Sequence, residues 1–155
     1  MSESPMQFKT IVVGTDGSEG AARAMEWAAR LAESTGAEVR AVNVLTYSHE
    51  FMRDITFDTV TTWRRSLEKE LKSKWVAPLV ERGIPYRCLV VEQDSPALGL
   101  VKAADKEGAD LIVVGTRGSS RLGGRMLGST SYSLAHHAHC PVTVVPPAAE
   151  SDPTA

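Results

Sequence analysis

The chain has 155 residues, of which 43% are hydrophobic and 23% charged, a composition typical of a water-soluble globular domain. Its formal net charge of −2 provides neither a basic surface for nucleic acid nor a polybasic patch for a membrane, and no apolar run approaches the roughly 20 residues of a membrane span. The N-terminus lacks the layout of a signal peptide and two cysteines cannot form a disulfide framework, so we expect a cytoplasmic protein.

The first predicted elements are a strand, a helix and a second strand. Residues 10–13 form an apolar run that ends in the Gly-Thr-Asp-Gly-Ser turn, 14–18. Ser18 is placed to cap the helix that follows, and Gly36 is placed to end it. The second strand is predicted over 39–45.

A long helix is predicted next, after a variable-looking stretch at 47–57. Apolar residues recur through it at every third or fourth position: Val60, Trp63, Leu67, Leu71, Trp75 and Leu79. We expect this stripe to lie in the core and not to hold a cofactor. Pro78 should disturb the last turn, and Gly83 should end the helix.

The second half repeats the alternation of strand and helix. A strand at 88–91 leads to a helix at 96–106, which Gly108 closes. The apolar strand 111–114 then leads through a glycine-rich loop to a helix that starts near Gly128. The last strand is predicted at 142–145.

Five strands joined by helices predict an α/β fold. Such strands pair in parallel through right-handed crossovers, which gives an open five-stranded parallel sheet of flavodoxin or Rossmann type, with helices on both faces. Glycine-bearing loops end strands one and four, and a strand order of 3-2-1-4-5 would bring them together at the point where the order reverses. We assign 8–146 to a single domain and expect flexible tails at 1–7 and 147–155.

The stretch 110–131 has the order that a phosphate site requires. Its buried strand stops at Gly115, a glycine loop follows, and Gly128-Ser129-Thr130 opens a helix. Glycines let backbone N–H groups approach an anion, and the helix start adds unpaired N–H donors and a partial positive charge. The alternative is an ordinary loop in which Ser129 only caps the helix.

Charged residues near these loops have two interpretations each. Asp16 would face ribose hydroxyls or a phosphate-bound Mg²⁺, or it would only accept a hydrogen bond within its own turn. Arg117, Arg121 and Arg125 lie beside the glycine loop, where they would contact phosphate or remain solvated.

A histidine group and two cysteines carry weaker signals. His136, His137 and His139 stand beside Cys140, but Pro141 predicts that the helix ends before 139, so we assign no metal site there. In the order 3-2-1-4-5, Cys88 and Cys140 lie about 19 Å apart on opposite edge strands, and a disulfide needs Cα atoms within about 7 Å.

Four segments of the chain together resemble the universal stress protein family, in its ATP-binding type. They are IVVGTDGSEGAARAMEWAARLA, VRAVNVL, ADLIVVGTRG and LGSTSYSLAHHAHCPVTVV, in matching order across about 8–146. The family's nucleotide motif, Gly-x2-Gly-x9-Gly-Ser/Thr, is present here as Gly115, Gly118, Gly128 and Ser129.

The resemblance implies a flavodoxin-like fold, a homodimer and an adenine-nucleotide site. Gly128, Ser129 and Thr130 would hold phosphates, and Gly115 and Gly118 would lie along the ribose and phosphates. The other implied site residues are Thr15, Asp16 and, through its backbone, Val44. The exposed edge strand Val142–Val145 would pair two copies.

We therefore expect a cytosolic stress-response sensor that binds an adenine nucleotide, ATP first and AMP, ADP or cyclic AMP otherwise, with Mg²⁺ held through the phosphates. No catalytic residue is assigned, because the Walker motif Gly-x4-Gly-Lys-Ser/Thr is absent. Two alternatives remain at this point. One is a slow Mg²⁺-dependent ATPase that uses Asp16, and the other is a dimeric interaction protein whose site stays empty.

Overall fold

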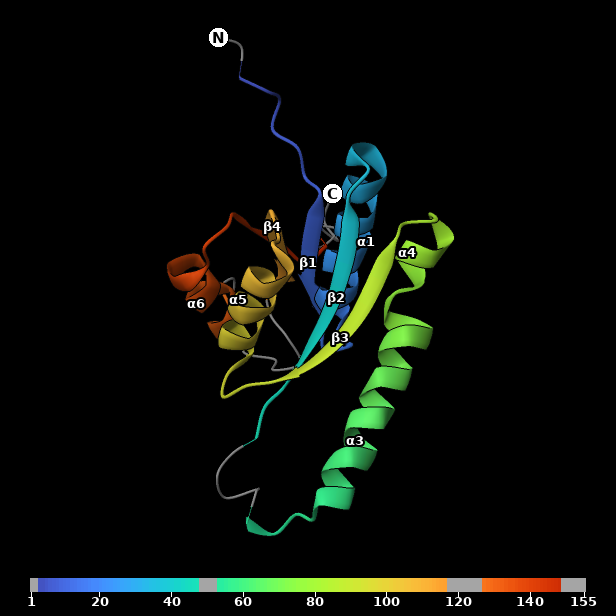
Figure 1. The fold of residues 1–155 in the computed structure, drawn as a ribbon, viewed down its shortest axis with the longest axis vertical. Helices are drawn as coiled ribbons and strands as arrows, with labels where there is room; N and C mark the ends of the chain where they lie inside the picture. Colours follow the sequence, from blue (N-terminus) through green and yellow to red (C-terminus); the bar gives the residue numbers. More distant parts are fainter. Residues whose placement is uncertain (1–2, 48–52, 117–126, 149–155) are drawn as a thin grey trace, which may run out of the picture.

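The computed structural model describes residues 3–47, 53–116 and 127–148 of the chain, and its centre is a parallel five-stranded sheet (Figure 1). The strands are β1 (Thr10–Gly14), β2 (Glu38–Leu45), β3 (Tyr86–Glu92), β4 (Leu111–Gly115) and β5 (Val142–Val145). Their order is β3-β2-β1-β4-β5, and every neighbouring pair is parallel. The predicted fold class and strand order are confirmed.

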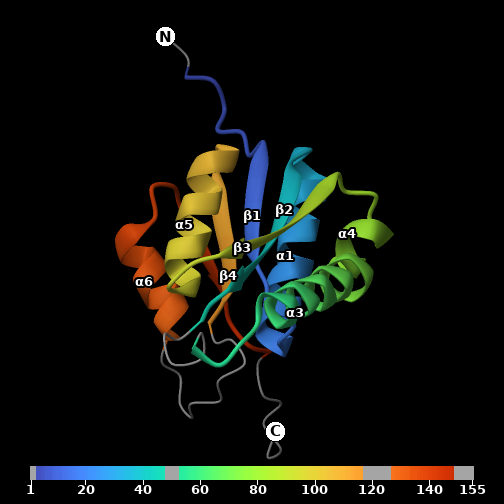
Figure 2. The same cartoon turned by 60° about the horizontal axis from the view of Figure 1, so that its bottom comes forward.

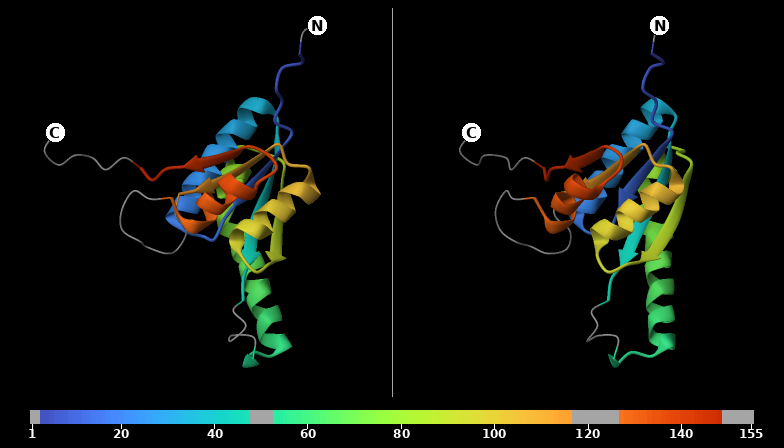
Figure 3. Two further views of the ribbon diagram at one scale, coloured as in Figure 1. Left: turned by 90° about the vertical axis from the view of Figure 1, so that its left-hand side faces the viewer. Right: turned by 60° about the vertical axis from the view of Figure 1, so that its left-hand side comes forward.

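Helices cover both faces of the sheet, as Figures 2 and 3 show. One face packs against α1 (Glu19–Thr35), the π-helical turn η1 (Leu71–Trp75) and α4 (Ala77–Glu81). The other packs against α5 (Pro96–Glu107) and α6 (Ser129–His137). No helix of the described residues is long and apolar enough to cross a membrane.

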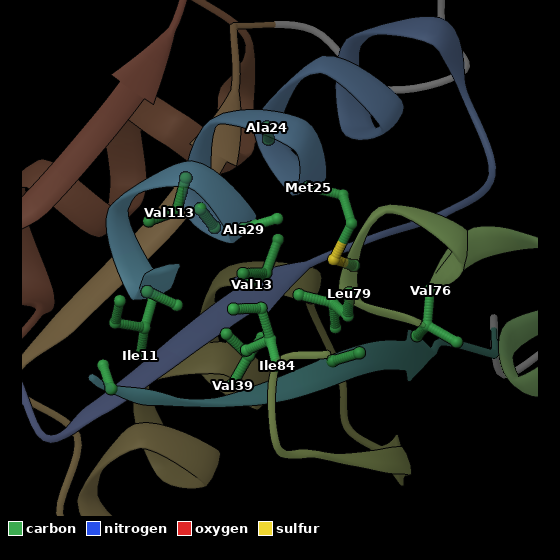
Figure 4. Packing of buried hydrophobic residues seen from close by; sticks show 14 of the residues in the cluster. Ile11, Val13, Ala24, Met25, Ala29, Val39, Val76, Leu79, Ile84 and Val113 are labelled. Atoms are coloured by element: carbon green, nitrogen blue, oxygen red, sulfur yellow. The ribbon is translucent and has the colours of Figure 1, made fainter. Parts of the chain in front are cut away.

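The alternation of side chains along the strands creates two separate cores. In β1, Ile11 and Val13 point to the α1 face, and Val12 between them points to the α5 face. Figure 4 shows Met25 of α1 next to Leu79 of α4 within the first core. All five of these side chains are fully buried. Because both faces are covered, the runs Ile11–Val13 of β1 and Leu111–Val114 of β4 are apolar and buried, as the sequence predicts.

The ends of α1 follow the predicted caps. The Ala21 N–H donates to Ser18 Oγ at 3.2 Å, which satisfies one of the donors that a helix start leaves open. At the other end Gly36 adopts a left-handed conformation with φ 76°, and its N–H donates to the Ala32 carbonyl.

The long helix predicted around residues 60–79 is confirmed in its break beside Pro78, but its prediction as regular α-helix up to that point is wrong. The structure divides it into α3 (Phe57–Glu70), η1 and α4. Apolar residues spaced by four drift about 40° per step on a helix of 3.6 residues per turn. The wider π-helical turn takes up this drift, so that Leu71 and Leu79 are both fully buried.

The predicted core position of Trp63 is also wrong. Helix α3 contains no buried residue, and Trp63 is 39% exposed. Figure 1 gives the reason, because α3 runs beyond the carboxyl ends of β2 and β3 and only its later turns lie beside the sheet. Only the end of the predicted stripe therefore lies in the core.

Candidate functional site

A cleft opens at the carboxyl ends of the strands, where the strand order reverses. The ends of β1, β2 and β4 meet there with the first turns of α1, α5 and α6. Its lining residues are Gly14, Thr15, Asp16, Ser18, Ala21, Val42, Asn43, Val44, Pro96, Leu100, Val114, Gly115 and Thr130.

Most of the predicted site residues come together around this cleft. Five of them line it directly: Thr15, Asp16, Val44, Gly115 and Thr130. Two more, Gly128 and Ser129, immediately precede Thr130 at the start of α6. Gly118 lies outside the described residues, as do Arg117, Arg121 and Arg125. Sequence reasoning missed Asn43, Pro96 and Leu100, since neither a motif nor a glycine marks them.

The turn after β1 is built by hydrogen bonds to β2 and within itself. The Thr15 N–H donates to the Val42 carbonyl at 2.9 Å, and Asn43 Nδ2 donates to the Thr15 carbonyl at 2.8 Å. The Ser18 N–H donates to Asp16 Oδ1 at 2.9 Å. Asp16 therefore forms the turn cap considered in the sequence, and it also lines the cleft.

The backbone of Val44 faces the cleft. The Val42 carbonyl accepts from Thr15 on the β1 side, and the Leu45 carbonyl accepts from Gln93 on the β3 side. Since backbone groups alternate sides along a strand, the N–H and C=O of Val44 point to the β1 side. The register of β1 with β2 ends at Gly14 opposite Val42. One donor and one acceptor at fixed spacing therefore border the open space beyond β1.

Asn43 carries an unsatisfied acceptor beside the cleft. Its side-chain nitrogen is held by the Thr15 carbonyl, while its Oδ1 is buried and has no hydrogen-bond partner among the described residues. Buried polar atoms are rarely left unpaired, because each one costs about 1–3 kcal/mol. Asn43 is thus a candidate site residue that the sequence analysis did not identify.

Gly115 lets α1 approach β4 closely. A Cβ built on Gly115 would lie 2.7 Å from the carbonyl oxygen of Gly20 and 2.8 Å from its carbonyl carbon. These atoms belong to the backbone of the first turn of α1, so no side-chain rotation could relieve the overlap. The lack of a side chain at Gly115 therefore brings the start of α1, with Ser18, to the edge of the cleft.

The start of α6 differs from the starts of the other long helices. Side chains of Ser18, Thr56 and Ser95 cap α1, α3 and α5. The N-cap of α6 is instead Gly128, and no side chain in the described part of the chain, Ser129 included, caps this helix. Its first-turn N–H groups, together with the positive end of the helix dipole, form an anion-binding arrangement.

Hydrogen bonds also hold the two ends of the glycine-rich loop together. The Gly128 N–H donates to the Thr116 carbonyl at 2.6 Å. The buried Ser131 hydroxyl donates to the Thr116 carbonyl at 3.3 Å or the Gly128 carbonyl at 3.0 Å. The end of β4 and the start of α6 are therefore held next to each other.

The histidines and cysteines lie apart from this cleft. Helix α6 ends at His137, as Pro141 predicts, and His139 Nδ1 contacts Asp105 Oδ2 at 3.0 Å. No group of three or more metal-ligating side chains occurs within residues 3–47, 53–116 and 127–148. Cys88 on β3 and Cys140 before β5 are free, and burial raises the pKa of both thiols.

Comparisons with known proteins agree in pointing to one family. The model of the Universal stress protein family matches residues 7–146. A universal stress protein of Thermus aquaticus is 35% identical over 138 residues, which cover 89% of this chain and 98% of that protein.

Two solved structures share the fold. A universal stress protein in complex with cyclic AMP superimposes with a TM-score of 0.67 at 26% identity, over 90% of this chain and 98% of the other. A universal stress protein of Archaeoglobus fulgidus in complex with dAMP does so with a TM-score of 0.65 at 23% identity, over the same shares of the two chains.

Proposed function

The chain belongs to the universal stress protein family, and from this premise we propose that it is a stress-response sensor that binds an adenine nucleotide in the cleft at the ends of β1, β2 and β4. The cyclic AMP complex of a relative at 26% identity supports a nucleotide ligand. ATP is the ligand we expect, with AMP, ADP and cyclic AMP as competitors. The two free cysteines suit a reducing cytoplasm, which we propose as the location.

The uncapped start of α6 carries this proposal. Phosphate oxygens would accept hydrogen bonds from the open N–H groups of Ser129 and Thr130, beside Gly128. Each such charge-assisted bond is worth roughly 1.5–3 kcal/mol. In this proposal Gly115 lies along the ribose and phosphates.

The backbone of Val44 suits the base. Adenine presents an amino donor beside a ring-nitrogen acceptor, which would pair with the C=O and N–H of one strand residue. Pro96 and Leu100 provide apolar surface in the same cleft for a flat ring. The base would thus be bound by a strand and the phosphates by a helix start.

We propose that the Asp16 carboxylate accepts hydrogen bonds from the ribose hydroxyls or binds a phosphate-bound Mg²⁺. The backbone of Thr15 holds the turn in place through its hydrogen bond to β2. Asp16 is the one charged side chain among the described residues that line the cleft. A polyanion beside this carboxylate would gain from a divalent cation. We therefore expect Mg²⁺ to strengthen ATP binding more than AMP binding.

The test of the proposed site is Gly128→Val, measured by calorimetry with ATP, AMP and cyclic AMP. Gly128 has φ −64° and ψ 163°, which valine also adopts, so the fold should persist while the side chain blocks the phosphate position. We expect affinity to fall at least about 100-fold, as the loss of two charge-assisted bonds implies.

Ala135→Val is the matched control, because it adds a β-branched side chain to an exposed position of the same helix. It should leave the affinity unchanged. Equal affinity of Gly128→Val and wild type would contradict the proposed phosphate position. If wild type bound no adenine nucleotide at millimolar concentration, the result would favour an interaction protein whose cleft holds no nucleotide.

We also propose a homodimer through the edge strand Val142–Val145. The Ile112 N–H donates to the Pro141 carbonyl, so alternation turns the backbone groups of Val142 and Val144 away from β4. At the opposite edge, Arg64 of α3 donates to the Val90 carbonyl of β3 at 2.7 Å. The β5 edge therefore offers outward backbone groups for pairing with a second copy, whereas the outward Val90 carbonyl of β3 is already bonded.

A further inference from the structure

Trp75 packs directly against the turn that follows β1. A Cβ built on Gly17 would lie 2.6 Å from Cζ2, 2.7 Å from Cε2 and 2.9 Å from Nε1 of the Trp75 indole. Gly17 stands between Asp16 and Ser18, both of which line the cleft. The indole therefore touches the cleft-forming turn from behind, and only a residue without a side chain fits between them.

The backbone around Trp75 fixes the position of the indole. Trp75 is the last residue of the π-helical turn η1, and its neighbours Leu71 and Val76 are fully buried. The side chain of Trp75 itself is half-buried and packs on the same core. Single π-helical turns are frequent at functional sites, because they change which residues a helix presents. Here the turn directs Trp75 toward Gly17.

A second aromatic contact links the same helical segment to the end of β2. Trp63 of α3 lies edge-to-face on Tyr47, with ring centroids 6.1 Å apart. Tyr47 follows β2 by two residues, and β2 carries Val44. The segment formed by α3 and η1 thus contacts two of the three chain segments that leave the cleft, the one after β2 through Trp63 and the one after β1 through Trp75.

We propose that Trp75 is a positioning residue that holds the Asp16–Ser18 turn in its ligand-binding conformation and so couples the cleft to η1 and α3. The coupling to a ligand rests on the proposed function. A nucleotide that contacts Asp16 would stiffen or displace the turn, and the indole behind Gly17 would transmit the change. Because α3 extends past the sheet and has no buried residue, a change in its position would be exposed to a binding partner at the surface (Figure 1).

The positioning role is testable without any ligand, by hydrogen exchange of the Trp75→Leu variant. Leucine keeps apolar bulk in η1 but withdraws the indole from Gly17. We expect the Ser18 and Ala21 amides, which bond within the turn and its cap, to exchange at least about tenfold faster. The Val13 amide in the sheet should not change.

Trp27→Leu is the control, because Trp27 lies on α1 and does not line the cleft. It should leave the amides of Ser18 and Ala21 unchanged. Unchanged exchange of these amides in Trp75→Leu would overturn the inference. An equal acceleration at Val13 would overturn it as well, since it would show that Trp75 only stabilises the fold.

Coupling to the ligand is tested with single-tryptophan proteins titrated with ATP. With Trp27 and Trp63 replaced by Phe, the emission of Trp75 should change saturably at the dissociation constant found by calorimetry. A protein that retains only Trp27 should show no change. In addition, Trp75→Leu should weaken ATP binding about 5- to 10-fold, with Trp27→Leu binding as wild type does.

The failures of the two proposals are distinguishable. If wild type binds ATP while Trp75 emission stays constant and Trp75→Leu keeps full affinity, the coupling is refuted and the nucleotide site stands. If wild type binds no nucleotide, the proposed function and the coupling fail together. The hydrogen-exchange rates of Trp75→Leu then decide by themselves whether Trp75 holds the turn.

Discussion

Replacing Gly115 with alanine tests how closely the site depends on the packing of α1 against β4. The new Cβ would meet the Gly20 carbonyl oxygen at 2.7 Å, so α1 or β4 must move. Overpacking of this kind costs about 1–3 kcal/mol. Gly115 does not have a positive φ, so alanine adds no backbone strain and recovers about 0.4–1 kcal/mol from the unfolded state. The net loss is at most about 2.6 kcal/mol, with a central value of about 1.3 kcal/mol.

Urea unfolding measures this loss as a lower midpoint at constant slope. Gly14→Ala is the matched control, because Gly14 ends β1 as Gly115 ends β4. Its new Cβ would meet only side-chain atoms, Leu100 Cδ1 at 2.8 Å and Val114 Cγ1 at 3.2 Å, which give way more easily than a backbone carbonyl does. We expect Gly14→Ala to be the milder change. A Gly115→Ala midpoint at or above wild type, or an equal loss in Gly14→Ala, would refute the packing argument.

Three further outcomes are expected. Ser18→Ala should lose about 1 kcal/mol with its cap, whereas Ser18→Gly should lose only a few tenths; equal losses in urea unfolding would contradict the cap. Burial raises the pKa of the Cys88 and Cys140 thiols, so folding holds these protons more tightly and the free energy of unfolding should fall as pH rises above about 8.5. The free energy of unfolding of a variant with both cysteines replaced by alanine should fall less over that range. A pH profile identical to that of wild type would refute the raised thiol pKa values as its cause. Val144→Pro removes a backbone donor that points away from β4, so light scattering should show a monomer, whereas Thr143→Pro should lower stability by breaking the bond to β4. If wild type is a monomer at micromolar concentration, the proposed homodimer is refuted.

The sheet was predictable because its information is local. Each strand is a short apolar run ended by a turn residue, and parallel connections leave few possible orders. The cleft followed from the same reasoning, since the loops after residues 14 and 115 had to meet if β1 and β4 were neighbours. The capping residues Ser18 and Gly36 could be predicted for the same reason, because their hydrogen-bond partners lie within four residues in the sequence.

The features that the sequence did not reveal depend on contacts between distant segments. The spacing of Leu71, Trp75 and Leu79 is compatible with one helix, and only their burial in a shared core favours a π-helical turn. The contact of Trp75 with Gly17 joins residues that are far apart in the chain, and no local pattern predicts it. Asn43 likewise looks like a break in an apolar strand until the Thr15 carbonyl is placed beside it.

The starts of the long helices show how stability and a candidate function share the same local chemistry. At α1 and α5 the chain uses Ser18 and Ser95 to satisfy helix donors, each cap worth about 1 kcal/mol relative to alanine and a few tenths of a kcal/mol relative to glycine. At α6 it places Gly128, which forgoes that side-chain bond at the mouth of the cleft. A serine at this position would fill its own helix start, and an incoming anion would then compete with an internal hydroxyl for the same N–H groups. Donors left open in this way favour a ligand over a cap, and the stability given up at α6 would be regained only when an anion binds.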